Sequence, residues 1–326
     1  MNIQMHLQNS DDGTTYDISS LVTGLQISSS LALGQPGKMV FTVERDPNEV
    51  LSISPGSRVH LTVDGKGVFF GYCFTMGRDK DGIHRITAYD QTRYLKNEEM
   101  TVTEGETASQ VFERLCVAHG LKYDIVTPTT FIPETIVHAG RSLFAIMERL
   151  IMLTNISEKR HYFIRDNFGV LEFTAVDRLK SNLVIGDGSL LTSYQYEISI
   201  DNDTYNTVKI VQEDEETGRL GVWIEFDSDN QKRWGKLQRL NVAAQGMNDA
   251  EIRSRASMLM EYHNRPTKTM RLTGIGSTDV DALSLRAGSG FTLALNDLGI
   301  NESMWITNAT HSINDDYHTF AWDVFI

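Results

Sequence analysis

The sequence predicts a mainly β protein in which two tube-like β-barrel domains flank a small α+β insert. Three observations lead to this fold class. Short strand-like stretches separated by glycine turns fill the first part of the chain, and helical periodicity is concentrated in the middle. A strand pattern from the first part then returns near the end. The predicted domains are residues 1–97, 98–188 and 189–326, the last with one helix at residues 248–264.

Alternating apolar and polar residues predict strands in the first domain, because successive side chains of a strand point to opposite faces. Asp64-Gly65 is a strong hairpin signal between two of these strands. Residues 34–37 and Asp81-Gly82 predict further turns. The predicted strands are residues 25–28, 39–43, 59–63, 68–74 and 83–89.

Two helices and a hairpin are expected in the insert. Thr107 and Gln110 form a capping-box pattern at the start of the first helix, and Gly120 supplies its stop. A second helix is expected from Ser142, with apolar residues at helical spacing. Residues 166–169 predict the turn of the hairpin that follows.

The last domain is read as strands with one capped helix. Asn248 and Glu251 are placed to cap its start, and Arg265-Pro266 ends it. The acidic run at residues 213–216 precedes Thr217-Gly218 and predicts a solvated hairpin tip. Four tryptophans are candidates for interface anchors, although core positions are the simpler interpretation: Trp223, Trp234, Trp305 and Trp322.

An internal repeat is the most informative pattern. Residues 55–64 and 287–296 share Gly-Ser followed by alternating apolar residues and Asp or Asn. Each stretch continues through a strand and an acidic turn, at residues 79–82 and 314–316, to a strand that contains Asp90 or Asp323. Two readings stay open: a duplicated β domain, or the general likeness of any two antiparallel meanders.

Bulk composition excludes several classes of function. The chain carries 43 acidic and 30 basic residues, and a net charge of −13 disfavours recognition of nucleic acid, which needs clustered cations. We expect no signal peptide and no membrane insertion, because the start lacks a basic and apolar leader and no stretch of about 20 apolar residues occurs. Cys73 and Cys116 are expected to be buried and unpaired.

No catalytic, cofactor-binding or metal-binding residues are predicted, and no cofactor. The loops at residues 201–206 and 227–229 lack the Gly and Glu that an EF-hand requires. The histidines form no HExxH motif, and Gly274-Ile275-Gly276 lacks the context of a dinucleotide site. Glu104 and Glu106 have no second acid positioned for glycoside hydrolysis. His60, His84 and His318 are expected at sheet surfaces or interfaces, and His119 at a helix C-terminus.

Four stretches, taken in order along the chain, carry a family resemblance. They are residues 70–74 (FGYCF), 88–97 (AYDQTRYLKN), 162–169 (YFIRDNFG) and the ending, from 285–288 (LRAG) to 322–323 (WD). Together they resemble the XkdQ/YqbQ family of phage-like tail proteins. The likeness spans nearly the whole chain, although no single motif is specific.

The resemblance implies a non-enzymatic, homotrimeric baseplate hub of a contractile phage tail or phage-tail-like bacteriocin. Such a hub matches a sixfold tail tube to a threefold central spike and also contacts baseplate wedge proteins, with the tape measure protein as a further candidate partner. It would assemble in the cytoplasm of the bacterial host and then form part of the particle.

Two alternatives to the hub remain. Residues 104–112 and 119–121 resemble the start of a LysM module, which binds peptidoglycan, although Ala108 replaces the usual Leu. A structural helix is the simpler interpretation of that stretch. The second alternative is a wall hydrolase with an unfamiliar site.

Overall fold

The structure, a computed structural model, describes residues 2–46, 50–201, 203–213, 220–243, 246–276, 282–314 and 317–325. The chain forms two compact units. Unit 1 comprises Met1–Gln195 and Met270–Ile326, and unit 2 comprises Tyr196–Thr269. No helix within the described residues is long and apolar enough to cross a membrane.

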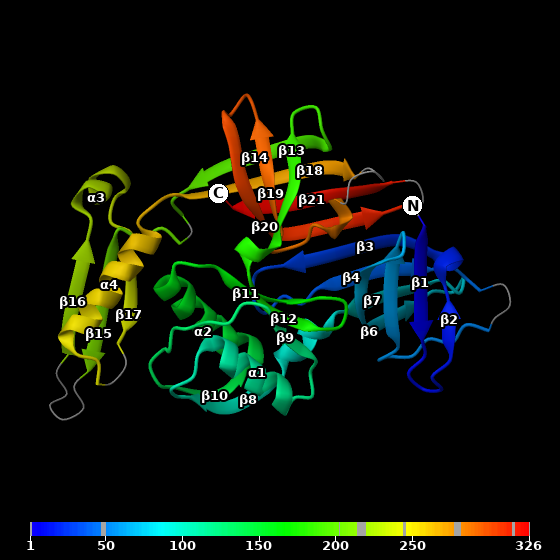
Figure 1. Cartoon of the computed structure of the whole chain (residues 1–326), viewed down its shortest axis with the longest axis horizontal. Helices are drawn as coiled ribbons and strands as arrows, with labels where there is room; N and C mark the ends of the chain where they lie inside the picture. Colours follow the sequence, from blue (N-terminus) through cyan, green and yellow to red (C-terminus); the bar gives the residue numbers. More distant parts are fainter. Residues whose placement is uncertain are drawn as a thin grey trace. The chain divides into compact units, whose positions relative to one another are not determined.

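A 13-stranded sheet dominates unit 1, and Figure 1 shows part of it as β18, β21, β20, β3 and β4 lying one beneath another. Its path is β14-β18-β21-β20-β3-β4-β7-β6-β5-β1-β2, and β13 joins it beside β19, which also pairs with β20. The strands are β1 (Ile3–Gln8), β2 (Thr15–Asp17), β3 (Val22–Ser30), β4 (Lys38–Val43), β5 (Arg58–Val63), β6 (Lys66–Arg78), β7 (His84–Tyr89), β13 (Lys180–Gly186), β14 (Leu191–Ser199), β18 (Thr267–Gly276), β19 (Gly290–Leu295), β20 (Ile300–Ile313) and β21 (His318–Phe325).

The prediction of a mainly β fold is confirmed, since strands make up 49% of the chain and helices 21%. Among the described residues, no strand pairing closes either set of strands into a barrel. Antiparallel pairing of β3 with β20 joins the N-terminal and C-terminal strands into one sheet. The predicted limits of three domains stay a prediction.

Alternating burial explains why these segments are strands with one inner face. In β4, β5, β19 and β21 every second residue is fully buried, as the binary pattern predicted. Aliphatic side chains such as Met39, Leu61 and Ile86 fill the N-terminal core. Aromatic rings are prominent in the C-terminal core, where Phe320 stacks on Trp322 with ring centroids 4.0 Å apart.

Helices and two small sheets form the α+β part of unit 1. The predicted caps are confirmed: Thr107 and Gln110 form a reciprocal capping box, and Ser142 caps the second helix. The helices pack together over a core that includes Phe112 and Phe173. The elements are β8 (Glu98–Thr103), α1 (Ala108–Ala118), β9 (Tyr123–Ile125), β10 (Ile136–Ser142), α2 (Leu143–Glu158), β11 (Tyr162–Asp166) and β12 (Leu171–Ala175).

Unit 2 has its own small core, formed by a three-stranded sheet and a helix. The predicted cap is again present, because Asn248 and Glu251 form a capping box. Val208, Ile210 and Ile252 are fully buried between sheet and helix. The elements are β15 (Thr207–Glu213), β16 (Leu220–Phe226), α3 (Ser228–Trp234), β17 (Gln238–Val242) and α4 (Asp249–His263).

Four short 3-10 helices complete the description: η1 (Ser19–Leu21), η2 (Gln91–Lys96), η3 (Val176–Leu179) and η4 (Ala282–Ser284). Some predicted loops lie partly outside the described residues. These are the acidic run at residues 213–216 with the following Thr217-Gly218, the loop at residues 201–206, and the acidic turn at residues 314–316.

Candidate functional site: the junction between two strand modules

Two sets of five strands in unit 1 repeat the same arrangement. We call β3, β4, β5, β6 and β7 the N-terminal module, and β14, β18, β19, β20 and β21 the C-terminal module. Of β14 and β18, only residues 191–195 and 270–276 belong to unit 1. Along the sheet the order is β14-β18-β21-β20 followed by β3-β4-β7-β6, so corresponding strands recur in the same sequence.

The two Gly-Ser turns have the same hydrogen bonds. Gly56 donates its N–H to the Cys73 carbonyl, and Cys73 donates to the Ser57 carbonyl. In the second copy, Gly288 donates to Ile306, and Ile306 donates to Ser289. Both glycines adopt left-handed φ angles, 84° and 88°. Local chain geometry is therefore repeated, and not only the general shape of a meander.

A β-bulge falls at the same place in both modules. The pairing of β6 with β7 shifts between Cys73 and Thr75, and the pairing of β20 with β21 shifts between Ile306 and Asn308. These bulges lie directly after the residues that bond to the Gly-Ser turns. A bulge is a specific feature of a strand, so this agreement favours a duplicated module over an accidental likeness.

The repeat also corrects the alignment expected at the closing strands. Cys73 pairs with Ala88, and Ile306 pairs with Val324. Asp323 consequently corresponds to Thr87, one residue before Ala88, and not to Asp90. The difference arises because the β20–β21 ladder continues for more residues beyond its bulge than the β6–β7 ladder does.

Three of the stretches that carry the family resemblance meet where the modules and the α+β part join. Gln91 donates its side-chain amide to the carbonyl of Gly169, and Gly169 donates its N–H to Asp166 over 2.9 Å. Arg286 donates to the side-chain oxygen of Asn167 over 3.1 Å. Residues 88–97, 162–169 and 285–288 therefore meet at one junction, part of which is buried, although they are far apart in the sequence.

Buried carboxyl groups give this junction unusual electrostatics. Burial, reinforced by the charge of Asp166, raises the pKa of Asp90 to about 8, although Thr92 donates two hydrogen bonds to it. Burial also raises the pKa of Asp166 to about 6. The Arg286 guanidinium is buried beside them, and this burial lowers its pKa. The cluster therefore favours a protonated carboxyl at neutral pH.

Close backbone approach makes the junction sterically specific. A Cβ on Gly37 would lie 2.0 Å from the Asp90 carboxylate, and a Cβ on Gly288 would lie 2.1 Å from the Phe163 ring. Ala287 beside it donates its N–H to Ser29 of β3 over 3.0 Å. The junction thus holds the two modules and the α+β part in one arrangement.

The space at this junction is too small for a substrate. Its cavity has a volume of about 40 Å³ and is lined by residues that include Ser29, Asp90, Asp166 and Arg286. Small-molecule sites usually measure about 300–1,000 Å³. Raised carboxyl pKa values often mark catalysis, but here they follow from burial in a packed junction.

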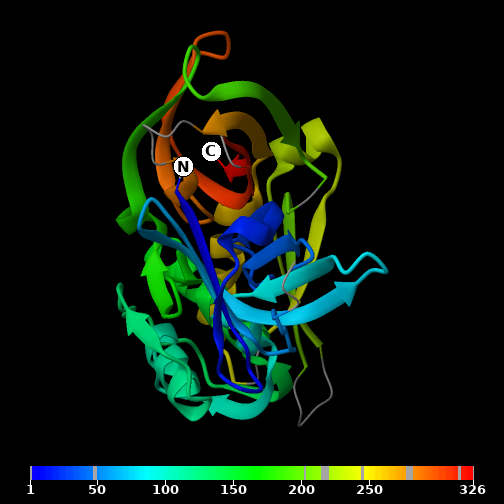
Figure 2. The ribbon, with the colours of Figure 1, turned by 90° about the vertical axis from the view of Figure 1, so that its right-hand side faces the viewer.

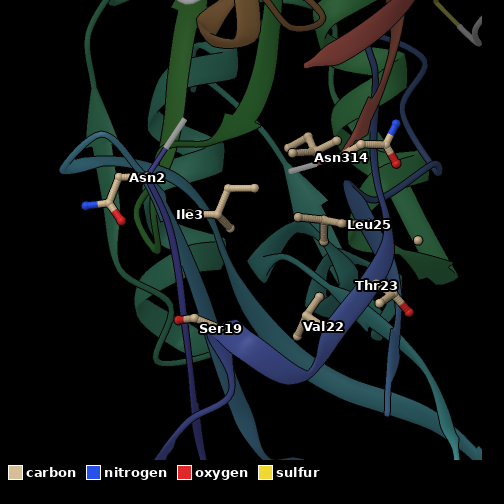
Figure 3. Close-up of a pocket in the computed structure, with 9 residues that line it drawn as sticks. Asn2, Ile3, Ser19, Val22, Thr23, Leu25 and Asn314 are labelled. Atoms are coloured by element: carbon tan, nitrogen blue, oxygen red, sulfur yellow. The ribbon is translucent and has the colours of Figure 1, made fainter. Parts of the chain in front are cut away.

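A larger groove lies at the far end of the β3–β20 pairing, and Figure 3 shows the side chains that line it. It has a volume of about 340 Å³ and is formed mainly by β1, η1, β3 and the end of β20. Ile3, Leu25 and Ile313 supply its apolar wall. Its lining holds no titratable side chain, and the Ser19 hydroxyl is engaged by Asp17. The groove therefore lacks a catalytic constellation.

The histidines and tryptophan discussed next were singled out from the sequence, and each is buried or half-buried in the fold. His318 is only 2% exposed, so its expected place at a surface is wrong; it fills the space beside Gly276, which has no side chain. His60 and His84 are half-buried on their strands. Trp322 is fully buried, which supports the core interpretation for it.

The remaining candidates can be placed briefly. Cys73 and Cys116 are buried and free, as predicted, and burial raises the pKa of each thiol to about 12. His119 caps the end of α1, as predicted. Across the described residues, no group of three or more His, Cys, Asp or Glu side chains is arranged to hold a metal ion.

Sequence reasoning missed the junction itself. Asp90, Asp166 and Arg286 were noted only as parts of matching stretches, because isolated charged residues give no spacing signal. Their best sequence signal was indirect, since three ordered stretches of one family proved to be neighbours in space.

The fold is that of phage tail proteins. The 43 kDa tail protein of prophage MuSo2 from Shewanella oneidensis superposes with a TM-score of 0.72 at 16% identity, covering 98% of each chain. The tail protein from Neisseria meningitidis MC58 gives a TM-score of 0.70 at 14% identity, covering 100% of this chain and 97% of that one.

The family is shown by the sequence. The model of the YQBQ-like family matches residues 28–324, so the chain belongs to that family. The PBSX phage-like element protein XkdQ of Bacillus subtilis strain 168 is 25% identical over 282 residues, which cover 84% of this chain and 82% of XkdQ. The predicted family resemblance is therefore confirmed.

Proposed function

We propose that the chain is the structural hub of a contractile phage-tail baseplate, acting as a homotrimer that joins the tail tube to the central spike. Its partners are then the tube and spike proteins, the baseplate wedge proteins and the tape measure protein. It assembles in the host cytoplasm and becomes part of the particle. Membership of a family that includes a PBSX protein, and the fold shared with prophage tail proteins, support this proposal.

One observation carries the proposed symmetry role: each chain contains two modules in the same strand order and the same direction along the sheet. Three copies would present six similar modules around a ring, which fits a sixfold tube. Three copies would still provide only three identical faces for a threefold spike. Closed rings follow from head-to-tail contacts when the rotation completes a turn.

A non-enzymatic role agrees with the geometry of the two cavities described above, which lie among the described residues. The junction is too small for a substrate, and the larger groove lacks titratable groups. The rival hydrolase would need an accessible acid and base, which neither of these two cavities provides.

The test of the hub is co-expression with the neighbouring tube and spike proteins, followed by native mass spectrometry and electron microscopy. We expect complexes with three copies of this chain per ring, one end bound to tube protein and the other to spike. A chain that stays monomeric with both partners present would overturn the proposal.

The peptidoglycan-binding alternative makes a different prediction. The α1 residues that resemble a LysM start are mostly structural here, because Ala108, Ser109 and Val111 are buried in the core of the α+β part. We therefore expect the chain to stay in the supernatant when mixed with purified peptidoglycan. Retention on the pellet that α1 surface substitutions abolish would favour the alternative.

A further inference from the structure

The three-stranded sheet of unit 2 has one covered face and one open face. β15 is the middle strand, and α4 packs against β15 and β16 on the face that carries Val208 and Ile210. Figure 1 shows α4 lying in front of these strands, and Figure 2 shows the same strands, in yellow-green, from a direction at 90° to the first. The side chains on the other face therefore receive no cover from α4.

Apolar side chains lie on this open face. They alternate with the buried ones along each strand, because successive side chains of a strand point to opposite faces. Val211 of β15 pairs with Val222 on one side and with Val242 on the other. Exposed apolar patches that extend over several strands are typical of binding surfaces. Besides Val211, the open face contains six side chains that are between 49% and 70% exposed: Leu220, Val222, Ile224, Phe226, Leu240 and Val242.

A lysine lies at the centre of the open face. Lys209 of β15 pairs with Ile224 of β16 on one side and with Leu240 of β17 on the other. Its side chain is half-buried, and it has no hydrogen bond or ion pair with any other residue that the structure describes. A partner that covers the face removes the ammonium group from water, which costs free energy unless the partner supplies a negative charge.

We propose that the open face binds an amphipathic helix of another protein, and that a carboxylate among the apolar residues of this helix pairs with Lys209. A helix fits because the covered face of the same sheet already holds one. There α4 places Ile252, Ala256 and Met260 on similar aliphatic side chains. The bound helix completes three layers, with the sheet between two helices. This binding rests on residues of unit 2 and does not depend on the hub function.

A second copy of this chain is the rival occupant, and the charge of Lys209 disfavours it. A two-fold contact centred on the open face would bring two Lys209 ammonium groups together. Like charges that face each other in an interface weaken it. A helix with a central carboxylate instead pairs with the lysine. We therefore expect the free chain not to associate through this face.

Three synthetic peptides test the open face. Each is an alanine-rich helix of about 16 residues, a length at which an isolated helix can form. Each has leucines along one side and either Glu, Gln or Lys at the centre of that side. Fluorescence anisotropy with the full-length chain measures the three affinities. We expect the Glu peptide to bind about tenfold more tightly than the Gln peptide, and the Lys peptide to bind most weakly.

Substitutions at Lys209 separate its charge from the apolar surface around it. Lys209→Glu should reverse the order of affinities, so that the Lys peptide binds best. Lys209→Met should abolish the preference and keep the binding of the Gln peptide. Lys268→Glu is the matched control, because Lys268 is exposed in unit 2 but lies on β18, outside the three-stranded sheet. An order of affinities that Lys209→Glu leaves unchanged would overturn the proposed ion pair.

Substitutions of two exposed isoleucines test the apolar part of the open face. Ile224→Ser should weaken the binding of all three peptides about tenfold, because it removes apolar area from the contact. Ile275→Ser is the matched control, since Ile275 of β18 is 48% exposed and Ile224 is 54% exposed. Circular dichroism confirms that each variant is folded.

Two results would overturn the proposed binding of a helix. One is the absence of binding by any peptide, or equal affinities for the wild type and Ile224→Ser. The other is self-association of the free chain, measured by sedimentation equilibrium, that Ile224→Ser abolishes; this would assign the open face to a second copy. Neither result bears on the hub, whose test is assembly with tube and spike proteins.

Discussion

The N-terminal and C-terminal modules have the same strand order but carry different attachments. The turn between β3 and β4 in the N-terminal module spans only residues 31–37. In the C-terminal module the corresponding connection, from β14 to β18, contains unit 2. The flanking edge strand differs as well, since β1 is antiparallel to β5 whereas β13 is parallel to β19.

The two modules therefore differ in their loops and edge strands but share the pairing of their central strands. Loop length costs little free energy once the two ends of the loop are held together, because closure entropy grows slowly with length. The Gly-Ser turn and the bulge recur in both modules, where the turn bonds to the residue directly before the bulge.

The two modules can be compared first by how much each core contributes to the free energy of unfolding. Trp322 and Ile86 occupy corresponding positions and are both fully buried. We expect Trp322→Ala to lower the free energy of unfolding by about 4 kcal/mol and Ile86→Ala by about 3 kcal/mol, because the larger ring leaves the larger cavity. Urea unfolding followed by circular dichroism measures both. Equal losses would show that the C-terminal core collapses around the cavity.

Gly56 and Gly288 occupy corresponding turns of the two modules. Both have left-handed φ angles, but only Gly288 lies in close contact with a neighbouring side chain. A Cβ on Gly56 would meet its nearest atom at 3.8 Å, whereas a Cβ on Gly288 would lie 2.1 Å from Phe163. We expect Gly56→Ala to cost about 1 kcal/mol from the left-handed φ alone, and Gly288→Ala about 3 kcal/mol. Thermal unfolding of the two variants gives the difference. Similar melting temperatures would mean that Phe163 moves aside freely.

Buried titratable groups give the junction and the C-terminal module opposite responses to pH. Unfolding returns the pKa of Asp90 from about 8 to 3.8, so the stability of its protonated form is lost as pH rises through about 8. Burial lowers the pKa of His311 in the C-terminal module to about 4, so stability is lost as pH falls from 6.5 through about 4.

Measurements between pH 7 and 9 keep His311 mostly neutral in both states, and comparison of the wild type with Asp90→Asn removes the contributions of other titrating groups, which the two proteins share. We expect wild-type stability to fall across this range and the fall to be smaller in Asp90→Asn, which keeps the oxygen that accepts from Thr92. Urea midpoints at several pH values provide the readout. Parallel slopes for the two proteins would contradict the assignment to Asp90.

Replacement of most of unit 2 is expected to have the smallest effect. Thr267 donates its hydroxyl to the Ser199 carbonyl over 3.1 Å, so the two ends of the connection are adjacent. A short turn in place of residues 200–266 should therefore leave unit 1 folded, with a change in stability within about 1 kcal/mol. Circular dichroism and thermal unfolding measure this. Loss of the folded sheet would show that the C-terminal module depends on unit 2.

Local signals in the sequence were sufficient for strands, caps and turns. The capping boxes at Thr107 and Asn248 and the left-handed turn at Asp64-Gly65 are as predicted, because each depends on neighbouring residues alone. Alternation in residues 59–63 likewise predicted which side chains of β5 are buried. The repeat was also detectable, although its closing strands were aligned at the wrong aspartate.

Long-range pairing decided the rest. Two meanders with the same pattern can close on themselves or join each other, and hydrophobic alternation is identical in both cases. The β3–β20 pairing selected the joined form. The meeting of Asp90 with Asp166 and Arg286 likewise depends on how three distant segments pack, and no spacing in the sequence expresses it.

The amino-acid sequence by itself therefore determined the strand-rich class and the family, since each follows from short-range patterns or their order along the chain. It also indicated the repeat, but left open whether the repeat is a duplicated domain. Only the tertiary structure decided that the two modules share one sheet and that three of the matching stretches meet at one junction. These features arise from hydrogen bonds and burial between residues far apart in the chain, which local chemistry does not specify.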